Sequence, residues 1–327
     1  MKYINLFDTQ AAYDEAQKYY PNVSYIVATD EVVYQENDPG PDYSKEYLTF
    51  EALQNGTFTL TVPAAADSTK MTSVSYSTDN GTNWTTTAID NTAQTITTPT
   101  IAQGDKVLWK GEGSTLYGST FSSTGNLNVM GNIMSMLYGD NYANQTTFPN
   151  GSEGTFSNLF KNATHLINAE NLVLPATTMT RVCYGEMFNG CTSLTTAPEL
   201  PAITLFYGCY TNMFTGCTSL TTAPELPATT LAKSCYELMF QGCISLTTAP
   251  ELSATTLTSN CYKQMFQNCN SLNSIKMLAT NISGINYLTN WVQGVAATGT
   301  FTKDASMSTL PSGDSGIPSG WTVVDIN

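Results

Sequence analysis

The chain has 327 residues, of which 41% are hydrophobic and 12% charged, and its formal net charge at pH 7 is −14. This length allows roughly two or three domains, and a charged share of about half the usual 25% leaves a surface rich in Thr, Ser and Asn. No cluster of Lys or Arg is present, so the sequence argues against nucleic acid and anionic lipid as partners. No run of about 18 apolar residues occurs, so we expect no membrane insertion.

Residues 1–40 predict a small α+β unit. Residues 2–7 look like a strand, Asp8 is a candidate N-cap for the helix after it, and residues 22–35 alternate as a hairpin does. About 40 residues make a poor independent core, so we expect this unit to pack on a partner chain. The candidate anchoring residues are Phe7, Tyr13, Tyr20, Tyr25, Val32 and Tyr34. Residues 35–46 have the acidic, proline-containing composition of a linker.

Residues 47–112 predict an immunoglobulin-like β-sandwich. Short segments alternate apolar and polar residues, and turn signals such as Asn80–Gly81 separate them. The expected strands lie within 47–50, 56–62, 72–77, 83–88, 94–98 and 105–110. This density of short strands is typical of a sandwich, and we expect Trp84 and Trp109 to anchor its core.

Residues 77–84 fit the Asp-box pattern S-x-D-x-G-x-x-W, which recurs in sialidase propellers. One interpretation is a glycosidase. The other is a hairpin turn in which Asp79 hydrogen-bonds its own loop and Trp84 packs inside. We favour the hairpin, because the Asp box is structural even in sialidases and a single copy does not build a propeller.

A period of 26 residues governs the C-terminal half. All eight cysteines fall into two columns with this spacing, one running from Cys183 to Cys261 and the other from Cys191 to Cys269. A period of about 20–29 residues is typical of leucine-rich repeats, which build a solenoid. The predicted boundaries are 113–156 for an N-terminal cap region, 157–294 for the repeats and 295–327 for a C-terminal cap.

Each repeat predicts one coil, with a short strand near Leu-Thr-Thr-Ala and a return arm of one or two helical turns. A single coil cannot bury its apolar side, so stacked coils would place identical residues about 4.8 Å apart in a continuous core. The fold expected for the whole chain is therefore multi-domain and mainly β, with an α/β solenoid. The expected core columns are Cys191, Cys217, Cys243 and Cys269, and Met187, Met213, Met239 and Met265.

The cysteines allow three interpretations: buried free thiols, disulfides or a metal site. Two cysteines of one repeat are eight residues apart, about 12 Å along a helical arm and too far for a disulfide. There is no CxxC pair, and His165 is the single histidine, so the spacing of zinc ligands is missing. We expect free thiols, no metal and no cofactor.

Two polar columns accompany the predicted strands. The threonines could bind carbohydrate or ice, or could form a plain β-branched strand surface. The glutamates could hold a cation or a glycan, or could splay into water because like charges repel. The candidate ligand-facing ladder is Thr196, Thr222 and Thr248 with Glu199, Glu225 and Glu251.

The string Cys-Tyr-x-x-Met-Phe-x-Gly-Cys-Thr-Ser-Leu-Thr-Thr-Ala-Pro-Glu-Leu-Pro-Ala resembles the BspA-like leucine-rich repeats of gut Bacteroidota and their phages. Residues 125–148 and 291–327 resemble the caps of those proteins. The resemblance covers residues 115–327; it implies a curved solenoid used in surface adhesion and transfers no catalytic residue. Residues 4–34 resemble the N-terminal segment of virion proteins in crAss-like and related gut phages, which implies attachment to the particle.

The sequence favours a non-enzymatic virion protein. It contains no acid–base pair and no GxSxG, Walker A or dinucleotide motif, and its first 16 residues lack the features of a signal peptide. We expect a head or tail fibre or a decoration protein, homo-oligomeric and bound to other virion proteins through its N-terminal unit. The expected ligand is a host surface polysaccharide or protein. The alternative is a bacterial cell-surface adhesin of the same repeat family, which would need a secretion route.

Overall fold

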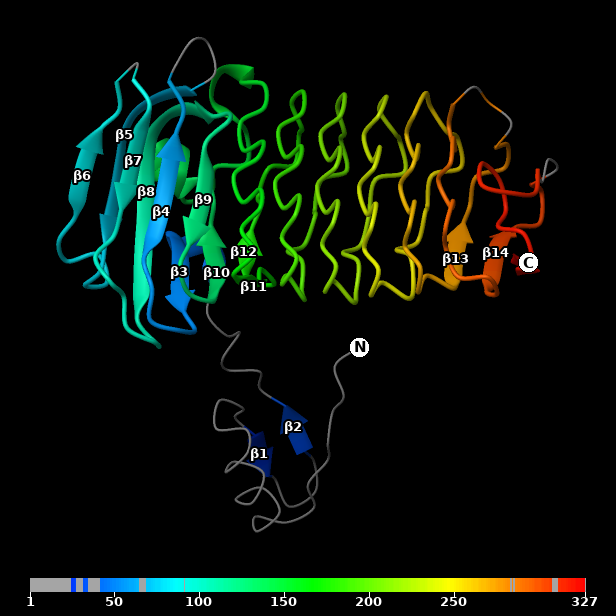
Figure 1. Cartoon of the computed structure of the whole chain (residues 1–327), viewed down its shortest axis with the longest axis horizontal. Helices are drawn as coiled ribbons and strands as arrows, with labels where there is room; N and C mark the ends of the chain where they lie inside the picture. The colour runs from blue at the N-terminus through cyan, green and yellow to red at the C-terminus, as the bar shows by residue number, and fades with distance from the viewer. Residues whose placement is uncertain are drawn as a thin grey trace. The chain divides into compact units, whose positions relative to one another are not determined.

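The computed structural model describes residues 25–27, 32–34, 42–64, 69–90, 92–282, 284, 286–307 and 311–326. The chain divides into two compact units, Met1–Asp42 and Tyr43–Asn327. The described residues are mainly β, with several sheets and very little helix (Figure 1). None of the helices among them is long and apolar enough to span a membrane.

In the first unit, β1 (Tyr25–Val27) pairs in antiparallel register with β2 (Val32–Tyr34). This pairing confirms the hairpin predicted within residues 22–35. The strand and helix predicted between residues 2 and 20 lie outside the described residues. The side chains of the candidate anchoring residues Phe7, Tyr13, Tyr20, Tyr25, Val32 and Tyr34 also lie outside them.

Two packed sheets begin the second unit. The first has the order β6-β5-β8-β3-β10 and continues into β11 and β12, and the second has the order β7-β4-β9. The strands of the sandwich are β3 (Leu48–Ala52), β4 (Phe58–Val62), β5 (Thr69–Ser77), β6 (Thr85–Ala88), β7 (Gln94–Thr97), β8 (Lys106–Leu116), β9 (Thr120–Ser123) and β10 (Leu127–Asn132). The short helices are η1 (Tyr43–Lys45), α2 (Ser135–Tyr138), η2 (Gly139–Asn141) and η3 (Pro149–Gly151).

The six strands predicted from the sequence correspond to β3 through β8, but the domain extends further than expected. The predicted boundary at residue 112 falls inside β8, and β9 and β10 pair with β4 and β3. The register of β8 against β5 shifts twice beside Gly113, where a Cβ would clash with the carbonyl oxygen of Lys70. Glycine therefore permits a bulge within one long strand rather than ending it.

Aromatic side chains join the two sheets. The ring of Phe50 on β3 lies 5.4 Å from that of Phe58 on β4 and 4.8 Å from that of Phe121 on β9, between centroids. Trp109 is fully buried beside Phe121, as predicted for a core anchor. Phe121 also stacks on Phe160 of the first repeat at 5.7 Å, so the sandwich core continues into the repeats.

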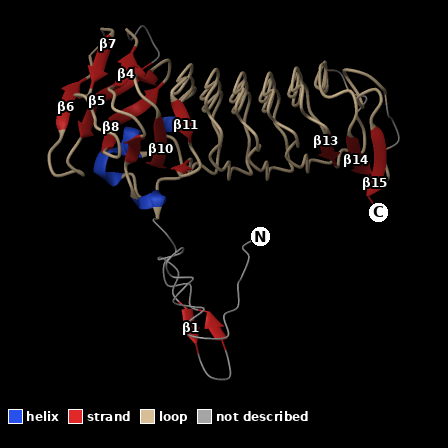
Figure 2. Cartoon of the chain, turned by 60° about the horizontal axis from the view of Figure 1, so that its bottom comes forward, coloured by secondary structure: helices blue, strands red, loops and turns tan. Residues whose placement is uncertain are grey.

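The 26-residue repeats form a row of coils after the sandwich (Figures 1 and 2). In each return arm, alternate backbone N–H groups donate to the next coil; Tyr184, for example, donates to the carbonyl of Cys209. The residues between donate three residues back along their own arm, as Gly185 does to Val182. Half of the N–H groups of the arm therefore join neighbouring coils.

The helical turns predicted for the return arm are wrong. Every fourth residue of the arm that contains Cys183 has a positive φ: 53° at Val182, 56° at Glu186 and 76° at Gly190. An α-helix needs negative φ throughout and bonds to the fourth residue back, so the arm is a succession of turns. Bonds between coils outweigh the local helix propensity of this segment, as tertiary context often does.

The strand predicted near Leu-Thr-Thr-Ala is reduced to single bridged residues. Parallel bridges join Asn168 to Thr196, Thr196 to Thr222, and Thr248 to Ser274. A proline follows two residues after each of these threonines, at Pro198, Pro224 and Pro250. Because proline has no N–H to donate, pairing is interrupted there, and in the last of these repeats it resumes at Leu252, which is bridged to Met277.

Paired strands close both ends of the row. At the first end, β10 pairs in parallel with β11 (Leu166–Asn168) and β12 (Leu172–Val173), so the sandwich itself covers the first coil. At the other end, β13 (Ser274–Met277), β14 (Thr300–Asp304) and β15 (Thr322–Ile326) form a parallel sheet (Figure 2). The segments predicted as separate domains between residues 47 and 327 are thus parts of one compact unit with one core.

Candidate functional site

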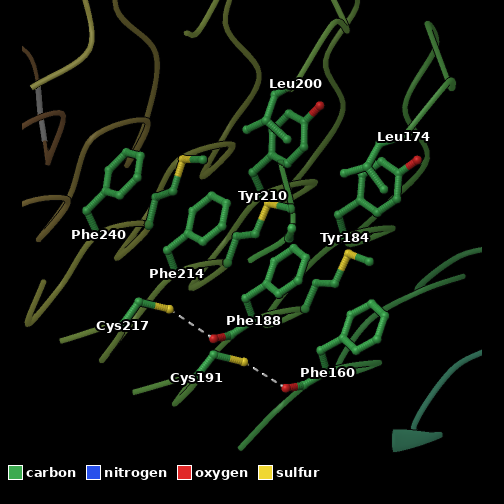
Figure 3. Close-up of a cluster of buried hydrophobic side chains, with 14 of the residues drawn as sticks. Phe160, Leu174, Tyr184, Phe188, Cys191, Leu200, Tyr210, Phe214, Cys217 and Phe240 are labelled. Atoms are coloured by element: carbon green, nitrogen blue, oxygen red, sulfur yellow. Dashed lines mark hydrogen bonds between the residues drawn. The ribbon is translucent and has the colours of Figure 1, made fainter. Parts of the chain in front are cut away.

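The repeat columns lie in the interior as rings and sulfur atoms stacked from coil to coil (Figure 3). Tyr184 and Tyr210 lie 5.9 Å apart between centroids, Phe188 and Phe214 lie 5.5 Å apart, and each pair is within 10° of parallel. The methionines predicted for the core, Met187, Met213, Met239 and Met265, are fully buried. These columns therefore provide packing and face no ligand.

The eight cysteines are buried free thiols. In one column each Sγ donates a hydrogen bond to a carbonyl of the preceding repeat: Cys191 to Phe160 at 3.0 Å and Cys217 to Phe188 at 3.1 Å (Figure 3). The Phe188 carbonyl also accepts the backbone N–H of Cys191, so the thiol uses its second lone pair. The repeat pattern predicted that these cysteines are buried, but it did not indicate this bond.

Burial makes these thiols poor nucleophiles. Removal from water raises the pKa of Cys191 to about 12 and that of Cys261 to about 11. The thiolate is the reactive and metal-binding form, and it is scarce at neutral pH when the pKa is this high. Within the described ranges, no group of three or more His, Cys, Asp or Glu side chains is placed to hold a metal ion.

The structure brings the predicted threonine ladder together only in part. Thr196 and Thr222 are bridged neighbours, and Thr222 and Thr248 have exposed side chains while Thr196 is half-buried. The glutamate column does not splay uniformly into water. Glu199 and Glu225 are exposed, whereas Glu251 forms an ion pair with Lys276, with 2.6 Å between Oε2 and Nζ.

The Asp-box segment forms a self-bonded turn. The carboxylate of Asp79 accepts the backbone N–H of Asn83 at 2.8 Å, the Asn83 amide at 2.7 Å and the hydroxyl of Ser77 at 2.8 Å. These bonds, the backbone bond first, lower the pKa of Asp79. The hairpin interpretation is therefore confirmed for Asp79, whose oxygens serve the turn.

The prediction that Trp84 packs in the core is wrong. It is half-buried at the surface, where its Nε1 donates to a carbonyl of its own turn and Lys110 Nζ lies 4.1 Å from a ring centroid. Lys110 also pairs with Asp140 at 2.7 Å, and Asp140 accepts the hydroxyl of Tyr47 at 2.8 Å. Burial, and then this bond, raise the pKa of Tyr47 to about 12. The polar groups of this cluster are bonded to one another.

One repeat has a group of exposed apolar side chains that the shared repeat pattern did not predict. Ile203, Phe206 and Tyr207 are 64%, 53% and 38% exposed. The signal was present in the repeat itself, because residues 203–207 read Ile-Thr-Leu-Phe-Tyr where residues 229–233 read Thr-Thr-Leu-Ala-Lys. A pattern built from the residues that all repeats share does not include positions at which one repeat differs from the others.

A cleft of about 460 Å³ lies beside this group, between the sandwich and the first repeats. Most of its lining residues carry a hydroxyl or a charged group, and their apolar parts also contribute to the wall. Its lining residues are Lys70, Thr115, Tyr117, Ser152, Glu153, Gly154, Arg181 and Val182. Among the surfaces of the described residues, this one combines a hollow with exposed apolar and cationic side chains, so it is the strongest candidate for a binding site.

Comparison with known proteins adds no relative. The chain matches no family model, no curated protein and no solved structure. The resemblance to BspA-like repeats remains an expectation from the sequence.

Proposed function

We propose that this chain is a non-enzymatic structural and adhesive protein of a phage particle, either a head or tail fibre or a decoration protein. Its first unit, residues 1–42, attaches to other virion proteins. The second unit displays a leucine-rich-repeat solenoid to a polysaccharide or protein of the host surface, and the chain assembles as a homo-oligomer.

Three features support the solenoid assignment. The period is 26 residues, the coils are joined by parallel bridges and by backbone bonds to the equivalent arm of the next repeat, and rings of one type stack in columns. Each coil contacts only its neighbours along the row, which is the arrangement that makes repeat proteins quasi-one-dimensional.

The observation that carries the display function is the single core of the second unit. It extends without a break from Leu48 in the sandwich to Trp321, the residue before β15. Binding to a preformed rigid surface costs little conformational entropy, because folding has already ordered the side chains that make the contacts. A continuous core of this kind suits a protein that presents a fixed surface outside a particle.

Mass spectrometry of purified phage particles from the source culture tests the assignment. The chain should be a stoichiometric component of particles that survive density-gradient purification, together with capsid or tail proteins. Its absence from such particles, with recovery on the outer surface of intact bacteria instead, would overturn the virion assignment in favour of the bacterial adhesin.

A further inference from the structure

One repeat exposes apolar side chains where its neighbours do not. Ile203 and Phe206 are more than half exposed, and Tyr207 is 38% exposed. The equivalent residues in the last full repeat are Thr255, Thr258 and Ser259. The fold therefore accepts polar residues at these positions. Exposed apolar area of this kind is better explained by binding than by folding.

Two cations flank the exposed tyrosine in the same column of the row. The guanidinium carbon of Arg181 lies 5.2 Å from the centroid of the Tyr207 ring, and Lys233 Nζ lies 5.8 Å from it. Arg181 has one exposed ion pair, with Glu153 at 3.3 Å, and an exposed pair of this kind exchanges easily. Lys233 forms no ion pair within the described part of the chain. The chain has 12 basic against 26 acidic residues, so a cationic strip is locally unusual.

This strip is continuous with the cleft. The N–H of Val182, which lines the cleft, donates to the carbonyl of Tyr207, so the exposed tyrosine borders the cleft wall. Two other residues that line the cleft extend this surface: Lys70 adds a third cation, and Tyr117 is 43% exposed. From the coil of Glu153 to the coil of Lys233 the surface crosses three coil steps, about 15 Å at ~4.8 Å a step.

We propose that this aromatic–cation surface, formed by the cleft with Arg181, Ile203, Phe206, Tyr207 and Lys233, binds an acidic polysaccharide. The C–H faces of sugar rings would lie on Phe206 and Tyr207. Carboxylate or sulfate groups would pair with Arg181 and Lys233, and sugar hydroxyls would bond within the cleft. The inference deepens the proposed function and rests on it, since it names the ligand that the displayed solenoid meets.

Charge and size favour this ligand over others. A neutral glycan would gain little from three cations gathered on a strongly acidic chain. A stable protein partner needs about 800 Å² on each side with a buried apolar centre, and three exposed apolar side chains beside a small cleft supply less than that. A linear anionic polymer needs only a narrow track of rings, hydroxyls and cations.

Surface plasmon resonance with the full chain tests the proposal, using polygalacturonate, chondroitin sulfate and neutral dextran as probes. We expect binding to at least one acidic polymer, none to dextran, and loss of binding at about 0.5 M salt because screening weakens exposed charge pairs. Equal binding to dextran, or binding to none of the acidic polymers, would overturn the inference.

Two sets of variants locate the site. The triple change Ile203→Thr, Phe206→Thr and Tyr207→Ser copies the last full repeat, so it should fold normally and bind roughly tenfold more weakly or worse. The pair Arg181→Gln and Lys233→Gln should have a similar effect and reduce the salt dependence.

Matched controls separate this surface from the rest of the row. Ile244→Thr removes another exposed apolar side chain, 44% exposed and in a different column, and should leave binding unchanged. Thr222→Ala tests the threonine ladder; if it abolishes binding while the triple variant binds normally, the ligand lies on the ladder and the inference is wrong. Mass spectrometry of the particles tests the virion assignment separately from polysaccharide binding. Either proposal can therefore be rejected while the other stands.

Discussion

At the scale of single residues, the cysteines of the Cys191 column have a role that volume alone does not explain. The Phe188 carbonyl accepts both the N–H of Cys191 and the thiol of Cys217. An alanine at this position would leave a small cavity and one unused lone pair in a dry core. The sulfur therefore contributes both packing and a weak bond between coils.

Replacement of Cys217 by alanine should lower the free energy of unfolding by about 1–3 kcal/mol, from the lost bond and the cavity together. Urea unfolding followed by circular dichroism measures this difference. Thr221→Ala in the same repeat is the control, because Thr221 is exposed and its loss should change stability by less than about 0.5 kcal/mol. Equal effects at both positions would show that the thiol contributes nothing specific.

The same thiols predict a loss of stability in alkali. Burial raises the pKa of Cys191 and Cys269 from 9.0 to about 12. Below pH 9 both folded and unfolded chains keep these protons; between pH 9 and about 12 only the unfolded chain releases them. Stability is thus complete below pH 9 and falls as pH rises, by up to about 1.4 kcal/mol per pH unit for each thiol.

Melting temperatures measured from pH 7 to pH 11 should show this decline, and Cys217→Ser should make it shallower because one thiol fewer ionises on unfolding. A melting temperature that stays constant up to pH 11 would contradict the burial of the cysteine columns.

At the scale of elements, the return arm depends on residues in the left-handed region. The column that contains Glu186 continues through Asn212, Leu238 and Gln264, with φ between 53° and 61°. Asparagine tolerates this conformation, whereas leucine does so at a cost of about 1–2 kcal/mol. Leu238 is therefore a strained position in an otherwise regular arm.

Leu238→Asn should raise the free energy of unfolding by about 0.5–1 kcal/mol, since it relieves strain at a half-buried site where little packing is lost. The reverse change one repeat earlier, Asn212→Leu, should lower it by a similar amount. Thermal unfolding of both variants provides the measurement; a stabilised Asn212→Leu would refute the account of the arm.

The elements also show how far the sequence could be interpreted. Strands such as β4 were predictable, because alternation of apolar residues is a local signal. β9 was missed, because its pairing with β4 joins segments some 60 residues apart. The helix predicted for the return arm failed for the same reason: the N–H of Tyr184 is satisfied by Cys209, a partner in the next coil.

The candidate site also combines features with a local sequence signal and features that depend on distant residues. The period placed Thr222 and Glu225 correctly at the surface, because the repeat pattern separates buried from exposed columns. It did not indicate that Phe206 and Tyr207 were exposed, since aromatic residues in a repeat are normally read as core. Only the stacked coils show that Arg181 and Lys233, 52 residues apart, lie on either side of one ring.

At the scale of the whole molecule, the open end of the row is closed by tryptophan. Trp291 is fully buried, and its Nε1 donates to the carbonyl of Gly316 at 2.7 Å. Its ring lies beside Phe266 of the last repeat and Phe301 of β14. One side chain therefore joins the last coil to the segment that covers it.

Trp291→Ala should destabilise the second unit by about 3–5 kcal/mol and open the row from this end, because each coil is stabilised chiefly by its neighbours. Hydrogen exchange should become faster across residues 261–277 and stay slow in β3 and β8. Faster exchange of equal size throughout the sandwich would instead show that the unit unfolds only as a whole.

The backbone bonds between coils have a consequence for how such a chain can change in length. Cys191–Pro198 and Cys217–Pro224 have identical sequences, and each coil presents to the next the same donors and acceptors that it receives. Removing or duplicating one complete unit of 26 residues therefore leaves every remaining coil with a matching neighbour, whereas a loss of a few residues breaks all the columns at once. The row of coils can therefore become longer or shorter by whole coils. The two ends, and the one coil with the exposed apolar side chains, keep their structure.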